Sequence, residues 1–439
     1  MRILMFGWEF PPHISGGLGT ACFGMTQALA RAGAEIIFVL PRADRGGAND
    51  FLRLASASGA LINEEMALRM DEAAQNAWRE SIRFLSVDSP IFPYLTPESY
   101  AQSVEWLRQQ GETYRRRQSG RSFTYELSGG YGPDLMGEVR RYSRLAAAIA
   151  LRESFDVIHV HDWMTYPAGM LVKALTGKPL VAHIHATEFD RSGENINEQV
   201  AGMERAGLMS ADRVVAVSHL TRKTVVERYG VPAQKVSVVH NAVARHEVER
   251  RYVVPPRIRH EKRVLFLGRV TFQKGPEYFM ESARLVLRKM PNVRFFMAGS
   301  GDMLPMLIRR AGQLRIGNRF HFAGFLRGEE VDRMFALSDL YVMPSVSEPF
   351  GITPLEAMLY DVPVLLSRQS GVSEVLKHAL KADFWDTRDM ADKICAVLRY
   401  PCLAAELVKN CRQEMKSIRW ENVAVQLMAI YRDVTGGCQ

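Results

Sequence analysis

Short apolar runs of buried-strand character recur along the whole chain with helical patterns between them, and this alternation constrains the fold more than any other feature. Continuous runs rich in Val, Ile, Leu and Phe are typical of parallel strands covered on both faces. In the first half these runs fall at residues 2–7, 35–41, 155–162, 179–186, 212–218 and 235–241. In the second half they fall at 263–269, 293–300, 319–326, 339–345 and 362–367. Each set is large enough for one doubly wound sheet, so the sequence predicts an α/β protein with two Rossmann-like domains.

The length of the chain agrees with two domains, because 439 residues are too many for one hydrophobic core. We expect an N-terminal domain over 1–244, a charged, Pro-containing linker over 245–262 and a C-terminal domain over 263–419. Residues 44–140 interrupt the first set of strands, and an insertion of that size is usually functional or a mobile lid. An amphipathic pattern over 420–436 predicts a closing helix that packs back on the N-terminal domain.

Composition limits the class of protein without choosing a function. Hydrophobic residues make up 47% of the chain and charged residues 24%, as in ordinary soluble globular proteins. The net charge of +8 suits anionic substrates, nucleic acid or an anionic membrane surface and selects none of them. Five cysteines without close pairing indicate reduced thiols and a cytoplasmic location. The N-terminal apolar run is too short for a signal peptide and no later run is long enough to span a membrane, so membrane contact is not indicated.

In doubly wound sheets ligands bind outside the carboxyl ends of the strands, and candidate residues stand at those positions. Gly16 and Gly17 follow the first strand and precede a helical pattern, so backbone N–H groups there can approach an anionic ligand closely. The glycine spacing is not the dinucleotide-binding fingerprint. A plain strand-to-helix turn explains the pair equally well.

Two His-x-His pairs end two of the predicted strands: His159 with His161, and His183 with His185. Alternation along a strand puts both histidines of a pair on the same face. Together with Asp162 they allow a metal site like that of a hydrolase. Satisfied packing is the commoner explanation for two of the four histidines. At strand ends, His161 and His185 are better interpreted as hydrogen-bonding groups for a polar ligand.

The second half places charged and small residues after its strands. Arg269 and Lys274 lie on one loop beside Gly275 and suit a diphosphate, which two cations can bind through charge-assisted hydrogen bonds. Gly299 lies in the sequence Ala-Gly-Ser-Gly-Asp at 298–302, where small residues allow a nucleotide to approach. Two cations on a loop are also commonly just solvated, and their position at a strand end is what favours a function.

Residues 347–358 place Glu348 before a predicted helix and Glu356 inside it. Thr353 and Glu356 have the spacing of a capping box with proline in the first turn, which is a structural explanation of Glu356. It leaves Glu348 unexplained, because that residue lies on the loop outside the helix. A carboxylate there could bind sugar hydroxyls while N–H groups at the helix start hold phosphate.

Together these motifs resemble the retaining, nucleotide-sugar-dependent glycosyltransferases of the GT-B fold, family 4. The resemblance covers nearly the whole chain, and its motifs are the Gly-Gly pair, His-Asp-Trp at 161–163, Gly-Arg-Val-Thr-Phe-Gln-Lys-Gly at 268–275, residues 347–358 and Ser-Gly-Val-Ser-Glu-Val at 370–375. The sequence at 7–19 and 185–193 is similar to that of the bacterial and archaeal glycogen-synthase-like branch. The resemblance implies a cleft between two Rossmann-like domains and glucosyl transfer onto an α-glucan or oligosaccharide.

The family pattern implies roles for single residues. Arg269 and Lys274 would bind the diphosphate and stabilise the leaving nucleotide. Glu356 would bind the ribose hydroxyls and Glu348 the donor sugar. His161 would contact the sugar and help to stabilise the positive charge at its reacting carbon. Further donor contacts are expected from Gly16, Gly17, Gly299, Phe350, Gly351, Ile352 and Thr353, and sugar or acceptor contacts from Asp162, His185 and Glu188.

The resemblance also implies the partners. They are a nucleotide-diphosphate sugar, with ADP-glucose or UDP-glucose as the first expectation, and a glucan or oligosaccharide acceptor; no nucleic acid is expected. No metal is required, because fixed cations stabilise the diphosphate. Ile14 and Thr20 stand where glycogen and starch synthases carry lysine and aspartate, and Glu356 stands where they carry tyrosine. A sucrose-type or cell-envelope glycosyltransferase therefore stays open as an alternative, and so, in another class, does a metal-dependent hydrolase that uses the His-x-His pairs.

Overall fold

The structure is a computed structural model of the 439-residue chain. It describes residues 1–11, 17–43, 51–79, 117–119, 122–132, 134–243 and 261–436. The chain forms two compact units: Met1–His240 with Trp420–Gln439, and Asn241–Arg419. Most of the expected linker, 245–262, lies outside the described residues.

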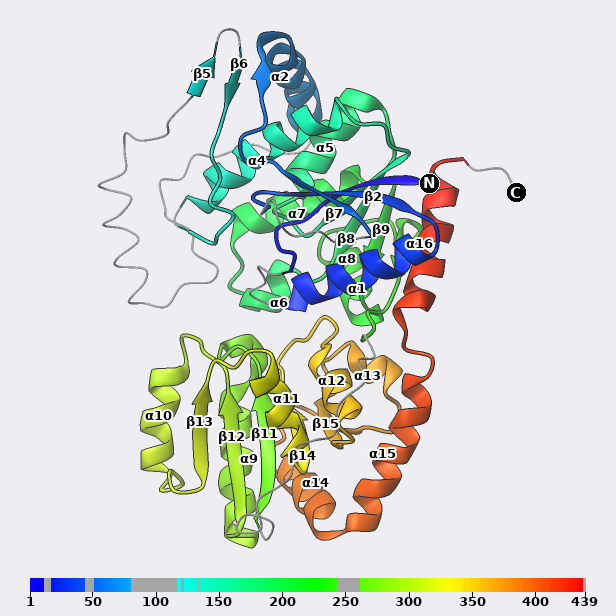
Figure 1. The fold of residues 1–439 in the computed structure, drawn as a ribbon. Coiled ribbons are helices and arrows are strands. Elements are labelled where there is room, and N and C mark those ends of the chain that lie inside the picture. Colours follow the sequence, from blue (N-terminus) through cyan, green and yellow to red (C-terminus); the bar gives the residue numbers. More distant parts are fainter. Residues whose placement is uncertain are drawn as a thin grey trace. The chain divides into compact units, whose positions relative to one another are not determined.

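A seven-stranded parallel sheet forms the centre of the first unit (Figure 1). Its strands lie in the order β10-β9-β8-β7-β1-β2-β3. The bounds are β1 Arg2–Phe6, β2 Glu35–Leu40, β3 Arg53–Ser56, β7 Val157–His161, β8 Leu180–Ile184, β9 Arg213–Ala216 and β10 Val236–Val238. The apolar runs predicted as strands in the first half of the sequence all lie in this sheet.

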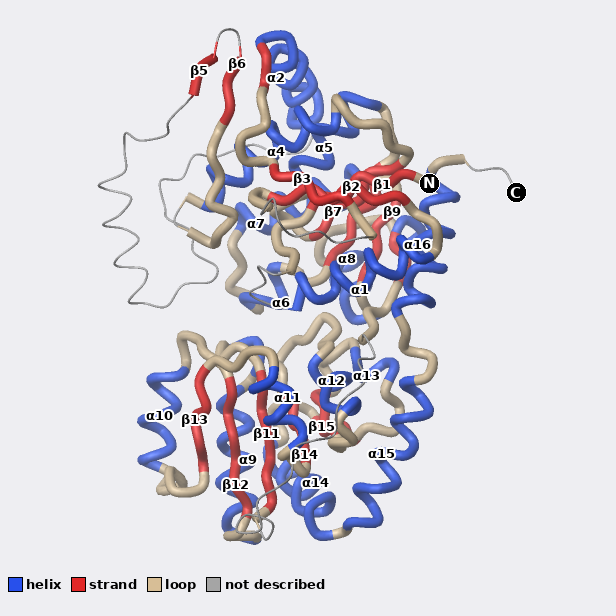
Figure 2. The backbone as a smooth tube through the Cα atoms, in the orientation of Figure 1, coloured by secondary structure: helices blue, strands red, loops and turns tan. Residues whose placement is uncertain are grey.

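Helices cover both faces of the sheet. The chain adds β2 beside β1 in one direction and β8 beside β7 in the other, so right-handed crossovers put α1 and α5 on opposite faces (Figure 2). The helices of this unit are α1 Gly17–Arg31, α2 Glu64–Arg79, α4 Leu135–Ala150, α5 Tyr166–Thr176, α6 Glu188–Ser192, α7 Glu198–Ser210, α8 His219–Glu227 and α16 Trp420–Val434, with a 3₁₀ turn at Ala233–Lys235.

The expected insertion, residues 44–140, belongs in part to the main fold. Its strand β3 pairs with β2 at the edge of the seven-stranded sheet, which the sequence analysis missed. A small antiparallel sheet in the order β4-β6-β5 is formed by β4 Ile62–Asn63, β5 Arg117–Ser119 and β6 Ser122–Thr124. Helix α4 begins at Leu135 and packs with α5, so the added segment is shorter than predicted.

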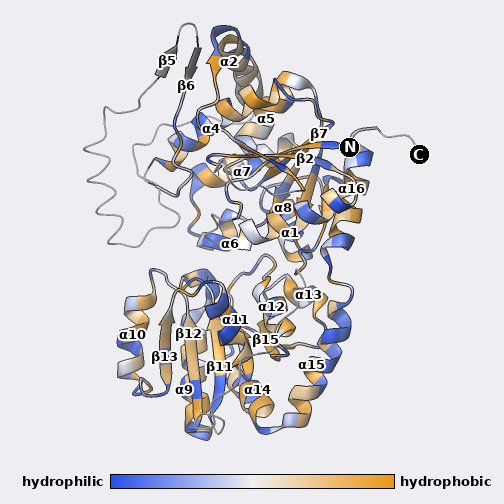
Figure 3. Cartoon of the chain, viewed as in Figure 1, coloured by the Kyte–Doolittle hydropathy of each residue, from blue (hydrophilic) through white to orange (hydrophobic). Residues whose placement is uncertain are grey.

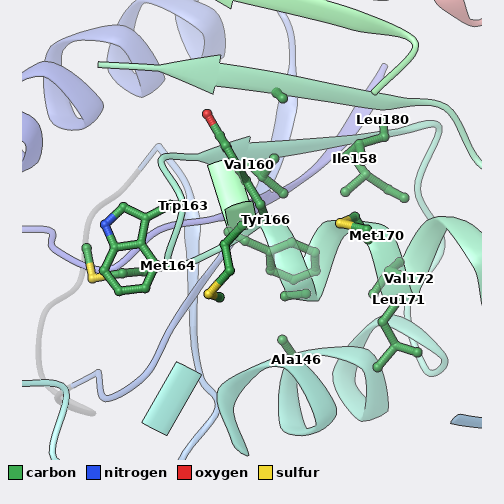
Figure 4. Close-up of a cluster of buried hydrophobic side chains, with 14 of the residues drawn as sticks. Ala146, Ile158, Val160, Trp163, Met164, Tyr166, Met170, Leu171, Val172 and Leu180 are labelled. Atoms are coloured by element: carbon green, nitrogen blue, oxygen red, sulfur yellow. The ribbon is translucent and has the colours of Figure 1, made fainter. Parts of the chain in front are cut away.

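Apolar side chains of the strands and of the helices around them form the core of the first unit, and the strands of both sheets are mostly hydrophobic in Figure 3. The side chains in Figure 4 come from β7, β8, α4, α5 and the β7–α5 loop: Ala146, Ile158, Val160, Trp163, Met164, Tyr166, Met170, Leu171, Val172 and Leu180. Burying each large aliphatic side chain contributes about 1.5–3 kcal/mol. Gly169 lets α5 lie close to β7, because a Cβ there would come within 2.4 Å of Val160 Cγ1.

The second unit contains a six-stranded parallel sheet in the order β13-β12-β11-β14-β15-β16. Its strands are β11 Lys262–Leu267, β12 Val293–Ala298, β13 Phe320–Gly324, β14 Leu340–Met343, β15 Val364–Ser367 and β16 Leu380–Ala382. Its helices are α9 Pro276–Lys289, α10 Leu304–Gln313, α11 Glu329–Ala336, α12 Thr353–Leu359, α13 Val372–Val375, α14 Thr387–Arg399 and α15 Pro401–Met415, with a 3₁₀ turn at Phe272–Lys274. The predicted strands of the second half are all present, and β16 was missed.

The last helix, α16, belongs to the first unit and packs against α1. Gly24 of α1 allows this approach, because a Cβ at that position would lie 2.3 Å from Trp420 Nε1. Tyr431, in the last turns of α16, reaches His159 of β7, where its hydroxyl lies 2.5 Å from Nδ1.

Within the described part of the chain, no helix has both the length and the apolar character that a membrane crossing requires. Cys22, Cys395, Cys402 and Cys411 are free thiols, as predicted; Cys438 lies outside the described residues.

Candidate functional site

Each sheet has one point at which successive strands are added in opposite directions, and ligands of doubly wound folds bind there, outside the carboxyl ends of the strands. In the first unit this switch point lies between β1 and β7, and in the second unit between β11 and β14. The loops that leave β1 and β7 carry Gly17 and Asp162. The loops that leave β11 and β14 carry Lys274 and Glu348. The two switch points therefore define two candidate sites, one in each unit.

Four histidines form a compact group at the carboxyl ends of β7 and β8, which we call the histidine array: His159, His161, His183 and His185. Across the strands, His159 Nε2 lies 3.3 Å from His183 Nδ1, and His161 Nδ1 lies 3.1 Å from His185 Nε2. Along each strand the rings lie close to one another, with centroids 4.4 Å apart on β7 and 4.3 Å apart for His183 and His185. The sequence predicted that each pair shares a face, and the parallel register between His161 and His183 brings the two pairs together.

Burial keeps the histidine array uncharged at neutral pH. It lowers the pKa of His159 to about 3, with the neighbouring His185 as a further cause, and it lowers the pKa of His185 to about 3. Burial and the neighbouring imidazoles also hold the pKa values of His161 and His183 well below the usual value. The array can therefore exchange hydrogen bonds with a neutral polar ligand.

Asp162 fixes the loop that follows β8. Its backbone is left-handed, with φ 58°, and its buried carboxylate accepts hydrogen bonds from the N–H groups of His185, at 2.7 Å, and Ala186, at 3.4 Å. Burial raises the pKa of Asp162 to about 7, although these N–H donors act in the opposite direction. Asp162 therefore holds His185 in place, which is a positioning role.

The predicted glycine pair is described only at Gly17, because Gly16 lies outside the described residues. Gly17 is exposed and is the first residue of α1. A Cβ at Gly17 would meet no atom within 4 Å, so packing does not explain the glycine.

Glu188 has a structural environment. It is buried, and its carboxylate accepts hydrogen bonds from Arg191 Nε at 3.0 Å, Ser192 Oγ at 2.7 Å and the Asn197 N–H at 3.1 Å. Arg191 also pairs with the buried Glu204. These contacts occupy both carboxylate oxygens, so we do not retain Glu188 as a sugar-contact candidate.

An ion pair joins the two loops at the second switch point. Lys274 Nζ lies 2.6 Å from Glu348 Oε2, and the same oxygen accepts a hydrogen bond from Ser345 Oγ at 3.1 Å. The Glu348 side chain is 8% exposed and that of Lys274 22%, so the pair is shielded without being sealed from solvent. The two residues were predicted to bind different parts of one donor, and the structure brings them together.

Two further residues, not singled out from the sequence as ligands, hold these loops against each other. Gly275 has φ 63°, and a Cβ there would lie 2.2 Å from the Pro344 carbonyl oxygen, so only glycine lets the loops approach this closely. The Gln273 carbonyl accepts a hydrogen bond from the Val346 N–H at 2.9 Å. In the sequence, the glycine directly after Lys274 is the signal for the close approach of the two loops.

Arg269 is exposed on the loop that also carries Lys274. Its guanidinium donates a hydrogen bond to Gln273 Oε1 at 3.2 Å. A cation at this position can contact an anion that approaches Lys274.

The loop between β14 and α12 is shaped around Glu348. Gly351 has φ 92°, and a Cβ at Gly351 would lie 3.0 Å from Glu348 Cγ and 3.1 Å from Met343 Sδ. The Phe350 side chain is buried, so only its backbone remains a candidate for donor contact. Gly351 therefore has a backbone reason and a packing reason to be glycine.

The predicted capping box is wrong. Helix α12 begins at Thr353, its N-cap is Ile352, and no side chain caps it. The Ile352 carbonyl instead accepts hydrogen bonds from the N–H groups of Leu355 and Glu356. Since Thr353 lies inside the helix, its hydroxyl cannot serve the following N–H groups, and the capping explanation of Glu356 is removed.

Glu356 lies in the first turn of α12 and is half-buried. Burial, with the nearby carboxylate of Asp332 as a second cause, raises its pKa to about 7. The buried Tyr341 of β14 lies near both glutamates, and burial followed by the charges of Glu348 and Glu356 raises the pKa of its phenol. Glu348 and Glu356 therefore flank one buried tyrosine that the sequence analysis did not identify.

The structure requires a glycine at position 299. Its φ is 138°, and a Cβ there would lie 1.8 Å from the Gly268 carbonyl oxygen. The loops after β11 and β12 touch at this point, where the Val270 N–H donates to the Ser300 carbonyl at 2.8 Å. Gly299 thus supports the loop that carries Arg269 and Lys274.

Among the described residues of the first unit, two sets of three side chains could hold a metal ion. They are His159 with His161 and His183, and Cys22 with His161 and His185, in each of which one ligand atom per residue lies within 4.8 Å of the others. Both sets belong to, or adjoin, the histidine array.

Two family models match successive parts of the chain. The model described as Glycosyltransferase Family 4 matches residues 106–247, and the model described as Glycosyl transferases group 1 matches residues 253–414. The first match contains the four residues of the histidine array, and the second contains Lys274, Glu348 and Glu356.

Similar proteins cover the chain from end to end. An uncharacterised glycosyltransferase of Methanocaldococcus jannaschii, MJ1607, is 26% identical over 449 residues, which is 98% of each chain. A glycogen synthase of Mycobacterium tuberculosis is 26% identical over 444 residues, 98% of this chain and 94% of that protein. HepE of Anabaena, solved in complex with UDP and glucose, has a TM-score of 0.64 at 16% identity over 99% of this chain and 100% of its own, which shows the same fold.

Proposed function

The chain belongs to the family-4-like glycosyltransferases of the GT-B fold, and we propose that it transfers glucose, with retention of configuration, from a nucleotide-diphosphate sugar to an α-glucan or oligosaccharide. The observation that carries the proposal is the Lys274–Glu348 pair, 2.6 Å apart at the switch point of the second sheet. It sets a cation for the diphosphate beside a carboxylate for the sugar.

Lys274 and Arg269 bind the diphosphate of the donor. Negative charge grows on the diphosphate as its bond to the sugar breaks, so cations fixed in advance stabilise the transition state more than the ground state. Losing one such electrostatic contact typically costs about 10²–10³ in kcat. This arrangement leaves no step for which a metal ion is needed.

Glu348 binds the donor sugar. Its contacts with Lys274 and Ser345 both fall on Oε2, so Oε1 is the candidate acceptor for a sugar hydroxyl. The backbone at Phe350, Gly351, Ile352 and Thr353 lies next to it in sequence, and the N–H at the start of α12 has no partner inside the helix. Glu356 binds the ribose hydroxyls.

The first unit supplies uncharged contacts to the sugar. His161 and His185 are neutral at physiological pH, and because His161 Nδ1 and His185 Nε2 contact each other, one nitrogen of each ring is left to donate or accept a hydrogen bond. Asp162 positions His185 through its N–H, and Gly17 gives the donor phosphates access to the start of α1.

The donor is ADP-glucose or UDP-glucose. HepE, which shares the fold, was solved with UDP and glucose, and the glycogen synthase of Mycobacterium tuberculosis supports a glucan acceptor. In the transfer the sugar–oxygen bond breaks and its electron pair leaves with the diphosphate. The acceptor oxygen forms the new bond on the same face, and its proton passes to the departing diphosphate.

A donor screen tests this function. Release of nucleoside diphosphate from ADP-, UDP- and GDP-glucose is measured with and without glucan. We expect glucan-dependent release with one donor, and a loss of at least about 10²-fold in Lys274→Ala and Glu348→Ala. Lys409→Ala and Glu406→Ala, which break an exposed ion pair elsewhere in the second unit, are matched controls and should keep the wild-type rate. Wild-type rates in the Lys274 and Glu348 variants would refute the site.

Two further measurements address the finer claims. Nuclear magnetic resonance of the first-formed product distinguishes an α-linkage, expected from retention, from a β-linkage. Turnover after exhaustive chelation separates the transferase from the metal-dependent hydrolase. The transferase keeps its rate, whereas a hydrolase that uses the His-x-His pairs would lose it.

A further inference from the structure

The histidine array contains two ring nitrogens with nothing to bind. Among the described residues, His161 Nε2 and His183 Nε2 are buried and have no hydrogen-bond partner. Both side chains are at most 1% exposed. Buried polar atoms are almost always paired, so two orphaned nitrogens in one cluster point to a ligand that binds them.

Three imidazoles of the array are close enough to share one ion. His159, His161 and His183 each offer a ring nitrogen, and these atoms lie within 4.8 Å of one another. A tetrahedral ion with metal–nitrogen bonds of about 2.0–2.1 Å holds its ligands about 3.4 Å apart. Side-chain rotations on two hydrogen-bonded strands can close that difference. A rotation that turns the unpartnered His183 Nε2 towards His159 breaks the contact between His159 Nε2 and His183 Nδ1, which is long at 3.3 Å.

The ring of His159 is already oriented for such a site. The Tyr431 hydroxyl of α16 holds its Nδ1 at 2.5 Å, and its Nε2 faces His183. Metal-binding histidines usually have their second nitrogen fixed in this way by a neighbouring group. Tyr431 is therefore the outer partner of one proposed ligand.

The competing set, Cys22 with His161 and His185, is less suited to an ion. Metal binding requires a thiolate, and the Cys22 thiol is fully buried beside the carboxylates of Asp162 and Glu9, which oppose a second negative charge. His185 Nε2 is also engaged with His161. The three-imidazole set needs no such ionisation.

We propose that His159, His161 and His183 form an inhibitory site for a divalent ion of the zinc class, which prefers imidazole ligands. An ion bound to His161 occupies the imidazole that the proposed function assigns to the donor sugar, so occupancy stops transfer. The binding part stands on the array alone, whereas the inhibition rests on the proposed function.

Binding is tested with the full chain after chelator treatment, by titration with Zn²⁺ and with Co²⁺ as a spectroscopic substitute. We expect one tight equivalent in the wild type, with the visible spectrum of tetrahedral cobalt bound by nitrogen. His183→Asn should weaken affinity by at least about 100-fold and Tyr431→Phe by about 10- to 100-fold. His378→Ala removes a half-exposed histidine of the second unit and should leave the affinity unchanged.

Circular dichroism confirms that each variant is folded before its affinity is interpreted, and the wild-type spectrum needs no variant. The absence of a tight equivalent in the wild type, or an unchanged affinity in folded His159→Asn and His183→Asn, overturns the site. A thiolate-to-cobalt charge-transfer band overturns it in favour of the Cys22 set.

Inhibition is tested by measuring each protein against its own metal-free rate. We expect Zn²⁺ to inhibit the wild type at the concentration that half-fills the site, and His183→Asn to need at least about 100-fold more. Binding without inhibition overturns the inhibitory role. An absence of transfer at any metal concentration is a failure of the proposed function and leaves the binding result standing.

Discussion

The two switch points have the same topology and opposite chemistry. At the first, four stacked and paired imidazoles are kept neutral by burial. At the second, a lysine and a glutamate form an ion pair that solvent still reaches. A sheet that adds strands in both directions creates a place for a ligand, and the side chains at the ends of the strands decide what kind of ligand it is.

The proposed function assigns different chemical groups of the substrates to the two switch points. Sugar hydroxyls are neutral and need donors and acceptors without charge, which buried imidazoles provide. A diphosphate is anionic and needs fixed cations with access from solvent. Four consequences of this contrast can be measured, and they are given in order of decreasing effect.

Acidification should destabilise the first unit and spare the second. The folded pKa of His159 and of His185 is about 3, against 6.5 in an exposed histidine, so the unfolded state binds more protons below pH 6.5. Stability is therefore lost as pH falls from 6.5 towards 3, by about 2 kcal/mol for each of these residues at pH 5.

Buried carboxyl groups change the stability with pH in the opposite direction. The pKa of Asp162 and that of Glu356 are raised to about 7, so their contribution is present at low pH and is lost as pH rises towards 7. Asp162 offsets about one histidine in the first unit, while Glu356 stabilises the second unit on acidification. Hydrogen exchange of β7 and β11 at pH 7 and pH 5 measures both units in one sample. Earlier opening of β11 at pH 5 would contradict the contrast.

Gly275→Ala should distort the charged site at the second switch point. The new Cβ would meet the Pro344 carbonyl in a left-handed backbone, so we expect the second unit to lose about 2–4 kcal/mol and transfer to fall sharply. Gly312→Ala is the matched control, because its Cβ would meet nothing within 4 Å in helix α10 and should add about 0.5–1 kcal/mol. Urea denaturation of both variants decides it; equal stabilities would mean that the loops can separate without cost.

Tyr431→Phe should destabilise the histidine array at the first switch point by a smaller amount. It removes the hydroxyl that contacts His159 Nδ1 and keeps the ring, so the expected loss of stability is about 1 kcal/mol. Thermal unfolding measures it, with the exposed Tyr400→Phe as the control. A wild-type melting temperature would show that the hydroxyl is dispensable to α16.

Salt should have the smallest effect, and only on donor binding. Screening weakens a solvent-reached contact between Lys274 and a diphosphate, so KM for the donor should rise roughly threefold between 0.05 and 0.5 M salt. The neutral array adds nothing to this dependence. Initial rates across the salt series test it, and a falling KM would indicate that the charges at the second switch point repel the donor.

The sequence predicted the sheets well because continuous apolar runs mark central parallel strands. The two strands of the parallel sheets that it missed, Arg53–Ser56 and Leu380–Ala382, lie at sheet edges and are short, with no β-branched residue. Burial on two faces produces the pattern, and these two edge strands lack it. The hydrophobic periodicity could not predict the order of the strands in each sheet, because that order depends on the crossover connections.

The sequence predicted which residues belong to the candidate sites, but it did not predict the contacts between them. Lys274 and Glu348 were each recognised, and their 2.6 Å pairing depends on how the loops after β11 and β14 meet. The contact between Tyr431 and His159 joins residues 272 positions apart. The capping box failed because a spacing of three residues fits a helix start and a helix interior equally well, and Thr353 lies inside. The structural role of Glu188 depends on its contacts with Arg191, Ser192 and Asn197, which the sequence pattern did not indicate.

The packing of α16 on the first unit has a consequence for biosynthesis. The first unit takes residues Met1–His240 and then Trp420–Gln439, so the ribosome makes the whole second unit before it supplies the helix that covers α1 and contacts His159. At about 5–20 residues per second this interval is roughly 10–40 seconds. During that time the face of α1 at Gly24 lacks Trp420 and His159 lacks the Tyr431 hydroxyl in the nascent chain. The second unit, made without interruption, can finish folding first, and the half of the protein that is translated earliest is completed last.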